Sequence, residues 1–531
     1  MTSALAFLVL AAPLAFLLVA AVASTQRGAR PAQTQLIGAI ASWFGVAVAA
    51  VAGVATFTNG LIESPTIGID GLGISVRLDA LSTVMLGMIA LLAVVIFRYS
   101  CTYLDGDDRH GRFLGWLVAT IASVEVLVLS GNIALLVVAW VTTSLALHQL
   151  LLFYRDRRRA VVAARKKFVA ARIGDLFLVA AAALLFHRFG TGNLETMFDA
   201  ARTAPQNGWG VGSLEAGALC LAVAALLKSA QFPTHGWLVE VMETPTPVSA
   251  LLHAGILNAG PFLAIRMAFV LDGARLATTM LIVVGGFTAV FASVVLLTQP
   301  SVKVALGYSS AAHMGFMLLV CGMGVYPAAL LHLVAHSFYK AHAFLSSGSV
   351  IDEVRAAKVT TPKRLGSPVR VAGSVAVALG MYVVLALVWG VSLTDEPVLL
   401  AIGAILVLGT TQIVAPAMDS TGGLAGTLRA GTLALAVTTA FFTLEAGAHR
   451  ILESITPTDG PRSALQLALI GLVVVTFGAV ILLQVLEPTR TMSQRRRALA
   501  IHFRNGFYAN ALFDRAVGAL RIPAPSTERP S

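Results

Sequence analysis

Cysteine is nearly absent from this chain of 531 residues, which contains only Cys101, Cys220 and Cys321. Three scattered cysteines are too few for a disulfide framework or a cysteine-based metal site, and there is no Cys cluster for iron–sulfur. The sequence also lacks a Gly-rich phosphate loop placed between a strand and a helix. We therefore predict no redox cofactor, no metal ligands and no catalytic residues in this chain.

Charge is scarce as well, since charged residues make up 12% of the chain and hydrophobic residues 57%. Mean hydropathy is +0.84, and apolar runs of about 20 residues, enough to cross a bilayer as a helix, recur from end to end. The first run lacks the basic start of a signal peptide and is long enough to span. The sequence predicts an all-α polytopic membrane protein of about 14–15 transmembrane helices. The predicted spans are 2–23, 36–57, 80–97, 113–130, 132–153, 168–187, 214–232, 246–270, 276–297, 303–323, 326–348, 369–391, 398–418, 424–444 and 463–486.

The net charge of +11 is concentrated in three loops, following the fifth, eleventh and fifteenth predicted spans. With an odd number of spans, all three loops fall on one side of the membrane. The positive-inside rule then predicts an inner (cell) membrane protein with its N-terminus outside and its C-terminus cytoplasmic. Anionic lipid headgroups account for this basic charge, and nucleic acid is not a predicted partner.

Three basic residues, His332, His336 and Lys340, interrupt the apolar run LLHLVAHSFYKAHAFL. Their spacing of four places them on one face of a helix, about 12 Å from first to last. Basic groups at bilayer depth are costly, and imidazole titrates near neutral pH. The spacing predicts a column of proton carriers inside the membrane.

Lys228 lies about fourteen residues into another apolar run, and Pro233 follows five residues later. Proline breaks a helix, and broken helices at membrane depth usually line a cavity or an ion site. A lysine that snorkels from a helix end is the alternative. We interpret Lys228 as a proton carrier.

The next run, ETPTPVSALLHAGILNAGPFL, carries His253, and we expect Pro261 to interrupt its helix. A single membrane histidine can be only an interhelical hydrogen-bonding group. With Lys228 before it and His332 after it, His253 more plausibly continues a chain of proton acceptors.

Three further residues are weaker candidates. Glu125 is a carboxylate twelve residues into the fourth predicted span, and His313 lies deep in the tenth. Asp175 lies beside Arg172, so a local salt bridge is as plausible as a role in the path. The predicted path is made up of Lys228, His253, His332, His336, Lys340, Glu125, Asp175 and His313.

Three long motifs resemble the proton-conducting membrane transporter family, which includes complex I antiporter-like subunits such as subunit L (NADH dehydrogenase subunit 5-like) and Mrp antiporters. They are KSAQFPTHGWLVEVMETPTPVSALLHAGILNAG (228–260), QPSVKVALGYSSAAHMGF (299–316) and LHLVAHSFYKAHAFLSSGSV (331–350), with AARIGDLFL (171–179) in support. The resemblance implies two inverted five-helix repeats with broken helices. It also implies that Lys228, His253, His332, His336 and Lys340 lie on the central proton path.

Two departures from that family narrow the resemblance. Val141 follows Trp140, where complex I and Mrp relatives carry a glutamate. Either Glu125 substitutes for the missing acid or the path is built differently. No long lateral helix follows residue 487. The chain is most similar to the B subunits (DabB) of DAB inorganic carbon transporters. That implies a large cytoplasmic, zinc-containing, carbonic-anhydrase-like partner of the DabA type, which would hold the zinc and perform any CO2 hydration.

The predicted function is that of a non-enzymatic membrane subunit, conducting H⁺ or another cation such as Na⁺ to drive inorganic carbon (CO2/bicarbonate) uptake by that partner. The alternatives are an L-like subunit of a proton-pumping NADH-quinone oxidoreductase or an Mrp-type Na⁺/H⁺ antiporter subunit. The expected division is N-terminal helices (1–110), two antiporter-like repeats (111–270 and 271–420), C-terminal helices (421–487), and a cytoplasmic amphipathic segment with a disordered tail (488–531).

Overall fold

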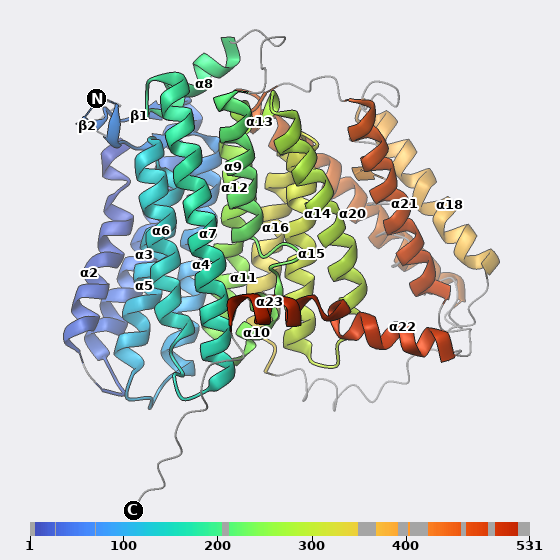
Figure 1. The fold of residues 1–531 in the computed structure, drawn as a ribbon, viewed down its shortest axis with the longest axis horizontal. Coiled ribbons are helices and arrows are strands. Elements are labelled where there is room, and N and C mark those ends of the chain that lie inside the picture. The colour runs from blue at the N-terminus through green and yellow to red at the C-terminus, as the bar shows by residue number, and fades with distance from the viewer. Residues whose placement is uncertain are drawn as a thin grey trace, which may run out of the picture.

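The computed structural model describes residues 6–26, 28–69, 71–203, 212–348, 368–390, 402–403, 423–457, 463–486 and 494–518. Almost all of this is helix, arranged as long, roughly parallel rods (Figure 1). The first group of long helices is α2 (Ala11–Thr25), α3 (Ala32–Asn59), α4 (Ala80–Tyr103), α5 (His110–Leu129), α6 (Ile133–Leu151), α7 (Arg158–Phe189) and α9 (Ser213–Lys228). The second is α11 (Thr246–Ala254), α12 (Ala259–Arg266), α14 (Arg275–Leu296), α15 (Val302–Gly322), α16 (Tyr326–Leu345), α18 (Pro368–Val388), α20 (Gly423–Leu452) and α21 (Ala464–Leu486).

The predicted all-α polytopic architecture is confirmed. In the described part of the chain, ten helices are long and apolar enough to cross a membrane. Every predicted span coincides with a helix except 398–418, which lies almost wholly outside the described residues. The division into five parts is not tested by the structure, and the predicted disordered tail also lies outside the described residues.

Two short β-ribbons and helix α8 (Leu194–Thr203) cover one end of the helices (Figure 1). Strand β1 (Ile62–Glu63) pairs antiparallel with β4 (Arg77–Leu78), and β2 (Ile67–Ile69) pairs with β3 (Leu72–Ile74). The segments between α4 and α5 and between α6 and α7 lie at the opposite end, where Arg109 Nη1 donates to the carbonyl of Phe153 at 2.9 Å. The two ends are called the ribbon end and the basic end below.

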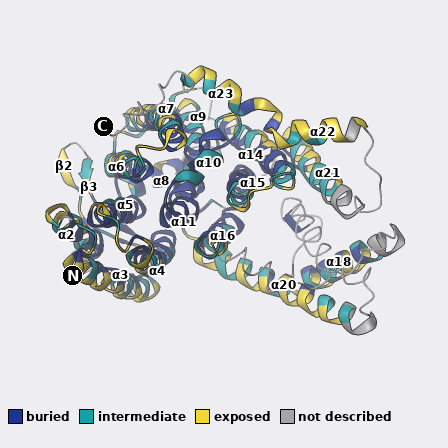
Figure 2. Ribbon diagram, turned by 90° about the horizontal axis from the view of Figure 1, so that it is seen from below, coloured by how far each residue is buried: buried dark blue, intermediate teal, exposed yellow. Residues whose placement is uncertain are grey.

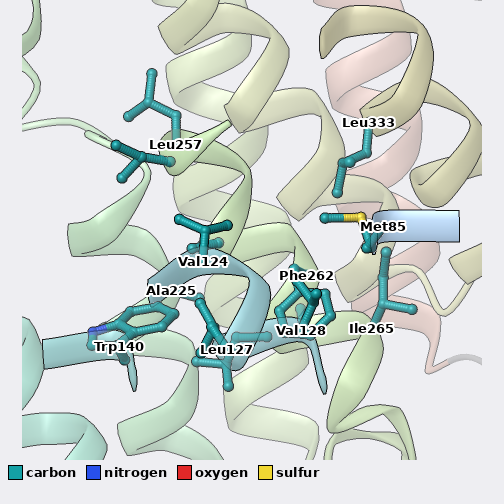
Figure 3. Close-up of a cluster of buried hydrophobic side chains, with 14 of the residues drawn as sticks. Met85, Val124, Leu127, Val128, Trp140, Ala225, Leu257, Phe262, Ile265 and Leu333 are labelled. Carbon is teal, nitrogen blue, oxygen red and sulfur yellow. The ribbon is translucent and has the colours of Figure 1, made fainter. Parts of the chain in front are cut away.

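The inward faces of the first group of helices are buried, whereas α18, α20 and α21 are largely exposed (Figure 2). Side chains of Val124, Leu127 and Val128 on α5 gather with Phe262 and Ile265 on α12 (Figure 3). Helices α14 and α15 approach closely because glycines face each other: a Cβ at Gly285 would lie 2.7 Å from the carbonyl oxygen of Gly315. Such small contacts allow helix backbones to pack closely in a membrane.

The predicted helix break after Lys228 is present. Helix α9 ends at this lysine, and the chain resumes as the short helix α10 (Gly236–Glu240), followed by η1 (Val241–Glu243). The expected interruption at Pro261 is wrong in position. Pro261 lies in the first turn of α12, where a backbone N–H has no partner within the helix, so a proline without this N–H is tolerated. The break comes earlier, at Gly255 and the turn η2 (Ile256–Asn258).

The C-terminal segment forms α22 (Gln494–Arg504), the turn η4 (Gly506–Tyr508) and α23 (Ala509–Val517). These helices run across the long helices in the half of the molecule toward the basic end (Figure 1). Helix α23 contacts α10 and α7, so this segment packs against its own chain. The remaining short helix, α13 (Ala268–Asp272), follows α12 at the ribbon end.

Candidate ion path

Lys228 lies at the last residue of α9 and is almost fully buried. Its ammonium donates a hydrogen bond to the carbonyl oxygen of Trp140 at 3.2 Å and lies 4.3 Å from the centre of the Trp140 ring. A backbone carbonyl and an aromatic face are neutral partners, and no carboxylate in the described residues forms an ion pair with this lysine, although Asp175 is close enough to interact with it electrostatically. This setting suits a group that gains and releases a proton.

A small cavity opens beside Lys228. It leaves about 10 Å³ for the centre of a water molecule, about what one water requires, and a second buried lysine, Lys167, lines it. Lys167 donates to the carbonyl and the hydroxyl oxygen of Ser144 at 2.7 and 2.9 Å. Leu252 and Ile256, on either side of the break between α11 and α12, also line the cavity. The cavity therefore connects the two broken helices.

His253 lies in the last turn of α11, next to this cavity wall. It is fully buried, and neither ring nitrogen has a hydrogen-bond partner among the described residues. The ring stacks on Phe344 of α16, with centroids 4.3 Å apart. Asn258 also ties this break to α16, donating to the hydroxyl of Ser337 at 2.7 Å. His253 is thus positioned between the Lys228 cavity and α16.

Helix α16 carries His332, His336 and Lys340 within one continuous helix, as the spacing predicted. Lys340 is fully buried, and its ammonium donates to the hydroxyl of Ser309 at 2.7 Å and to the carbonyl of Leu306 at 3.2 Å. Like Lys228, Lys340 has only neutral hydrogen-bond partners in the described structure.

His313 of α15 completes a cluster with the two histidines of α16. Its Nδ1 lies 2.9 Å from Nε2 of His332, and its ring centre lies 4.9 Å from that of His336. His336 is buried, and both its nitrogens lack a partner among the described residues. Sequence reasoning predicted no metal ligands and did not group these three histidines, because the packing of α15 on α16 joins residues that are separate in sequence.

A larger cavity, of about 510 Å³, adjoins this cluster between α14, α15, α16, α20 and α21. His313, His332 and Ser309 supply polar groups to its wall, and the remaining lining is mostly apolar, including Phe316 and Phe441. The histidine cluster is therefore reachable by a small molecule or ion from this space.

The other two predicted path residues lie in different surroundings. Asp175 forms an ion pair with Arg172 at 2.6 Å, the local salt bridge that was one of its two interpretations, and it also interacts electrostatically with Lys228 and Lys167. Glu125 is fully buried, but a Cβ at Gly45 of α3 would lie 3.8 Å from its Oε1 and 3.9 Å from Ala90 of α4. The Glu125 carboxyl therefore faces the N-terminal helices.

A buried ion network holds the C-terminal helix α23 against the break between α9 and α10. Lys166 is fully buried and donates to both carboxylate oxygens of Glu240 at 2.6 Å, and it forms an ion pair with Asp514 of α23. Asn510 donates to Glu240 at 2.6 Å, and a Cβ at Gly236 would overlap Asn510. Sequence reasoning placed Lys166 and Lys167 in a basic loop, whereas both are buried within α7.

A second buried network lies at the ribbon end. Arg77 donates to Asp79 at 2.7 Å, to Glu195 at 2.5 Å and to Glu63 at 3.1 Å, and Arg266 of α12 also pairs with Asp79. Burial alone would raise the pKa of Asp79. The guanidinium groups of Arg266 and Arg77 outweigh burial and hold that pKa well below its usual range. Asp79 also caps α4, so the network joins the ribbons to α4 and α12.

Comparison with known proteins gives a consistent assignment. Residues 130–392 match the family model "NADH:quinone oxidoreductase/Mrp antiporter, TM", and residues 68–114 match "NADH-Ubiquinone oxidoreductase (complex I), chain 5 N-terminus". The chain is 37% identical over 452 residues to the probable inorganic carbon transporter subunit DabB2 of Halothiobacillus neapolitanus. This alignment covers 84% of this chain and 81% of the relative.

Other relatives match over a shorter stretch. The probable inorganic carbon transporter subunit DabB of Hydrogenovibrio crunogenus is 43% identical over 279 residues, which cover 52% of this chain and 53% of the relative. NADH-quinone oxidoreductase subunit L of Escherichia coli is 35% identical over 301 residues, covering 56% of this chain and 48% of the relative. The chain therefore spans about half the length of these two relatives.

The fold is similar to that of a chain in the Mrp complex from Dietzia sp. DQ12-45-1b, with a TM-score of 0.57 and 23% identity, covering 98% of this chain and 58% of that chain. Helices, breaks and buried basic groups define an antiporter-like membrane subunit. The chain belongs to the NADH:quinone oxidoreductase/Mrp antiporter family, whose members are ion-translocating membrane subunits.

Proposed function

We propose that this chain is the ion-conducting membrane subunit of an energy-coupled inorganic carbon transporter. The observation that carries the proposal is a row of buried basic groups with neutral partners, running from Lys228 past the small cavity and His253 to His336 and Lys340. The relatives named as inorganic carbon transporter subunits support the substrate class, above all the one aligned over 84% of this chain.

The path works by linked protonation. Lys228 and His253 are separated by the cavity at the helix breaks, and His253 stacks on the residue one turn beyond Lys340. A proton entering from the ribbon end would move down the electrical gradient, which is worth about 2.3 kcal/mol per charge for each 100 mV. Where two side chains of the path do not touch, a water molecule in the cavity would pass the proton between them.

Coupling requires a second site that responds to protonation. We assign that part to a cytoplasmic partner docked at the basic end, where α10, α22 and α23 lie. The partner would be a zinc-containing, carbonic-anhydrase-like subunit that hydrates CO2 to bicarbonate. Ion flow would supply the energy that makes this hydration run in one direction, so that bicarbonate accumulates in the cytoplasm. In this arrangement the chain itself makes and breaks no covalent bond.

Replacing Lys340 tests the path. We expect Lys340→Ala to reduce bicarbonate accumulation by more than tenfold in cells that contain both subunits, because the column then lacks its last carrier. Lys340→Arg should fail similarly, since guanidinium keeps its proton. His342→Gln is the matched control, because His342 is exposed on the same helix. Normal uptake by Lys340→Ala at equal expression would disprove the path.

The alternative functions differ in the ion that the chain conducts and in the subunits with which it assembles. Purification of tagged chain in mild detergent should bring down a large zinc-containing soluble protein. Co-purification of flavin and iron–sulfur subunits would instead support a redox-driven complex. Na⁺-dependent pH changes in vesicles would support an Mrp-type antiporter subunit.

A further inference from the structure

We propose that His313, His332 and His336 form a binding site for one divalent transition-metal ion, with Zn²⁺ as the expected occupant. Each histidine offers one ring nitrogen, and the three nitrogens lie within 4.8 Å of one another. The site goes beyond ion conduction, because it would bind a metal whether or not protons move through the chain.

The geometry is close to that of a three-histidine metal centre. Zinc binds imidazole nitrogen at 2.0–2.1 Å, so three tetrahedral ligands lie about 3.4 Å from one another. The 2.9 Å contact between His313 and His332 would open slightly, and the ring of His336 would close toward it. Because α15 and α16 already pack together, rotation of the imidazole rings is enough to adjust the distances between these nitrogens.

His336 is the observation that points to a ligand. It is 4% exposed, and neither of its nitrogens has a hydrogen-bond partner among the described residues. An unsatisfied buried imidazole loses the hydrogen bonds it had in water, and a metal ion would restore one of these interactions. Lys340 does not take that place, because its ammonium donates to Ser309 and to the Leu306 carbonyl.

The large cavity supplies access and a fourth ligand position. His313 and His332 line this space of about 510 Å³, so a water or hydroxide could complete the coordination there. Three protein ligands with one open position are typical of accessible zinc sites. Zinc with hydroxide carries a net charge of +1, the same charge that the cluster would carry with one proton. Imidazole ligands also favour Cu²⁺ and Ni²⁺ over harder cations such as Mg²⁺.

Metal binding to the purified chain tests the site directly. Metal-free protein in detergent is titrated with Zn²⁺ in competition with a chromogenic chelator. We expect one site per chain that His336→Gln and His332→Gln each weaken by at least about tenfold, since even loss of an outer-shell partner costs 10–100-fold. His342→Gln, on the exposed side of the same helix, should stay within about twofold of the unmodified chain.

Co²⁺ provides a second readout, because tetrahedral coordination by histidines gives intense visible absorption that surface binding does not. His313→Gln is a third independent variant if one of the others fails to elute as a single species. The proposal is overturned if all three folded variants bind Zn²⁺ like the unmodified chain, or if His342→Gln alone abolishes binding.

A consequence for transport rests on the proposed function. Bound Zn²⁺ would occupy the imidazole nitrogens that carry protons, so it should block ion flux in proteoliposomes at the concentration that fills the site. Binding without inhibition would leave the metal site intact and contradict the assignment of these histidines to the path. Absence of binding would disprove the metal site and leave the path untouched.

Discussion

Glu125 presents a carboxyl group inside a bundle of apolar helices, and both oxygens lack a hydrogen-bond partner in the described structure. Its neighbours lie on α3 and α4, and Lys228 contacts Trp140 instead. We therefore expect Glu125→Gln, which keeps the shape of the side chain, to retain transport within about threefold of the unmodified chain, roughly 0.7 kcal/mol at the rate-limiting step. Transport assays in cells would measure this.

Replacement by Glu125 is one of the two sequence-based explanations for the acid missing after Trp140, the other being a path built differently. The same variant decides between them. If Glu125→Gln abolishes transport at normal expression while Glu125→Asp retains it, a titrating carboxyl is needed at this position. That result would support the sequence-based hypothesis, although the Glu125 carboxyl faces α3.

Asp79 is a second buried acid with the opposite surroundings, since Arg77 and Arg266 both pair with it. Removing one partner of a buried ion pair leaves uncompensated charge, so Asp79→Asn should lower the free energy of unfolding by about 3–5 kcal/mol. Asp105→Asn is the control, because Asp105 pairs with Arg30 on the exposed surface and should cost less than about 1 kcal/mol. Thermal unfolding in detergent would compare the two.

The same pair of variants gives a pH dependence. Because the folded-state pKa of Asp79 lies below its ordinary value of 3.8, its contribution to stability is complete above that pH. The contribution declines as pH falls through the lower, folded-state value. The stability gap between the unmodified chain and Asp79→Asn should therefore be constant from pH 7 to pH 5 and narrow below pH 3.8. A gap that widens on acidification would contradict this assignment.

At the scale of elements, α23 restrains the broken helix. Lys166, Glu240 and Asp514 join α7, α10 and α23, and Asn510 packs directly on Gly236. We expect Asp514→Asn to loosen this contact and raise hydrogen exchange of residues 229–245 by about tenfold or more, equivalent to at least 1.4 kcal/mol of local stability. Exchange followed by mass spectrometry would measure it.

Arg515→Gln serves as the control for α23, because Arg515 is exposed on the same helix. It should leave exchange of 229–245 unchanged. Equal exchange in Asp514→Asn and the unmodified chain would show that α23 lies on the break without stabilising it.

The helices and the break after Lys228 were predictable from local pattern, whereas the position of the second break and the contacts between distant segments were not. His332, His336 and Lys340 lie on one face of α16 because four residues make slightly more than one helical turn. By contrast, the position of His313 beside them depends on how α15 rotates against α16. Lys166 and Asn510 are 344 residues apart, and no local pattern brings them together.

The burial of Lys166 and Lys167 also could not be predicted from local sequence pattern. Five arginines precede them within a dozen residues, which favours a solvated loop. The helix instead starts at Arg158 and runs for 32 residues, so its first turns extend beyond the apolar core. Polar partners on α6, α10 and α23 then decide that these two lysines point inward.

For the whole molecule, the arrangement of the ends predicts the orientation in the membrane. Arg155, Arg157 and Arg159 lie between α6 and α7 or at the start of α7, at the basic end with α23, whereas Glu63 and Glu195 lie at the ribbon end. Positive charge on short loops favours the cytoplasm. We therefore expect the basic end to face the cytoplasm, with protons entering from the ribbon end.

Labelling of single cysteines tests this orientation. Asn59 is exposed at the ribbon end and Arg155 at the basic end, and the native Cys101, Cys220 and Cys321 would first be replaced by serine or alanine. A membrane-impermeant maleimide should label Asn59→Cys in intact cells and Arg155→Cys only in permeabilised cells. The reverse pattern would place the C-terminal helices and the proposed partner outside. The membrane potential would then drive protons from the basic end toward the ribbon end. A partner docked at the basic end would lie outside the cell, so ion flow could no longer power a cytoplasmic hydration step.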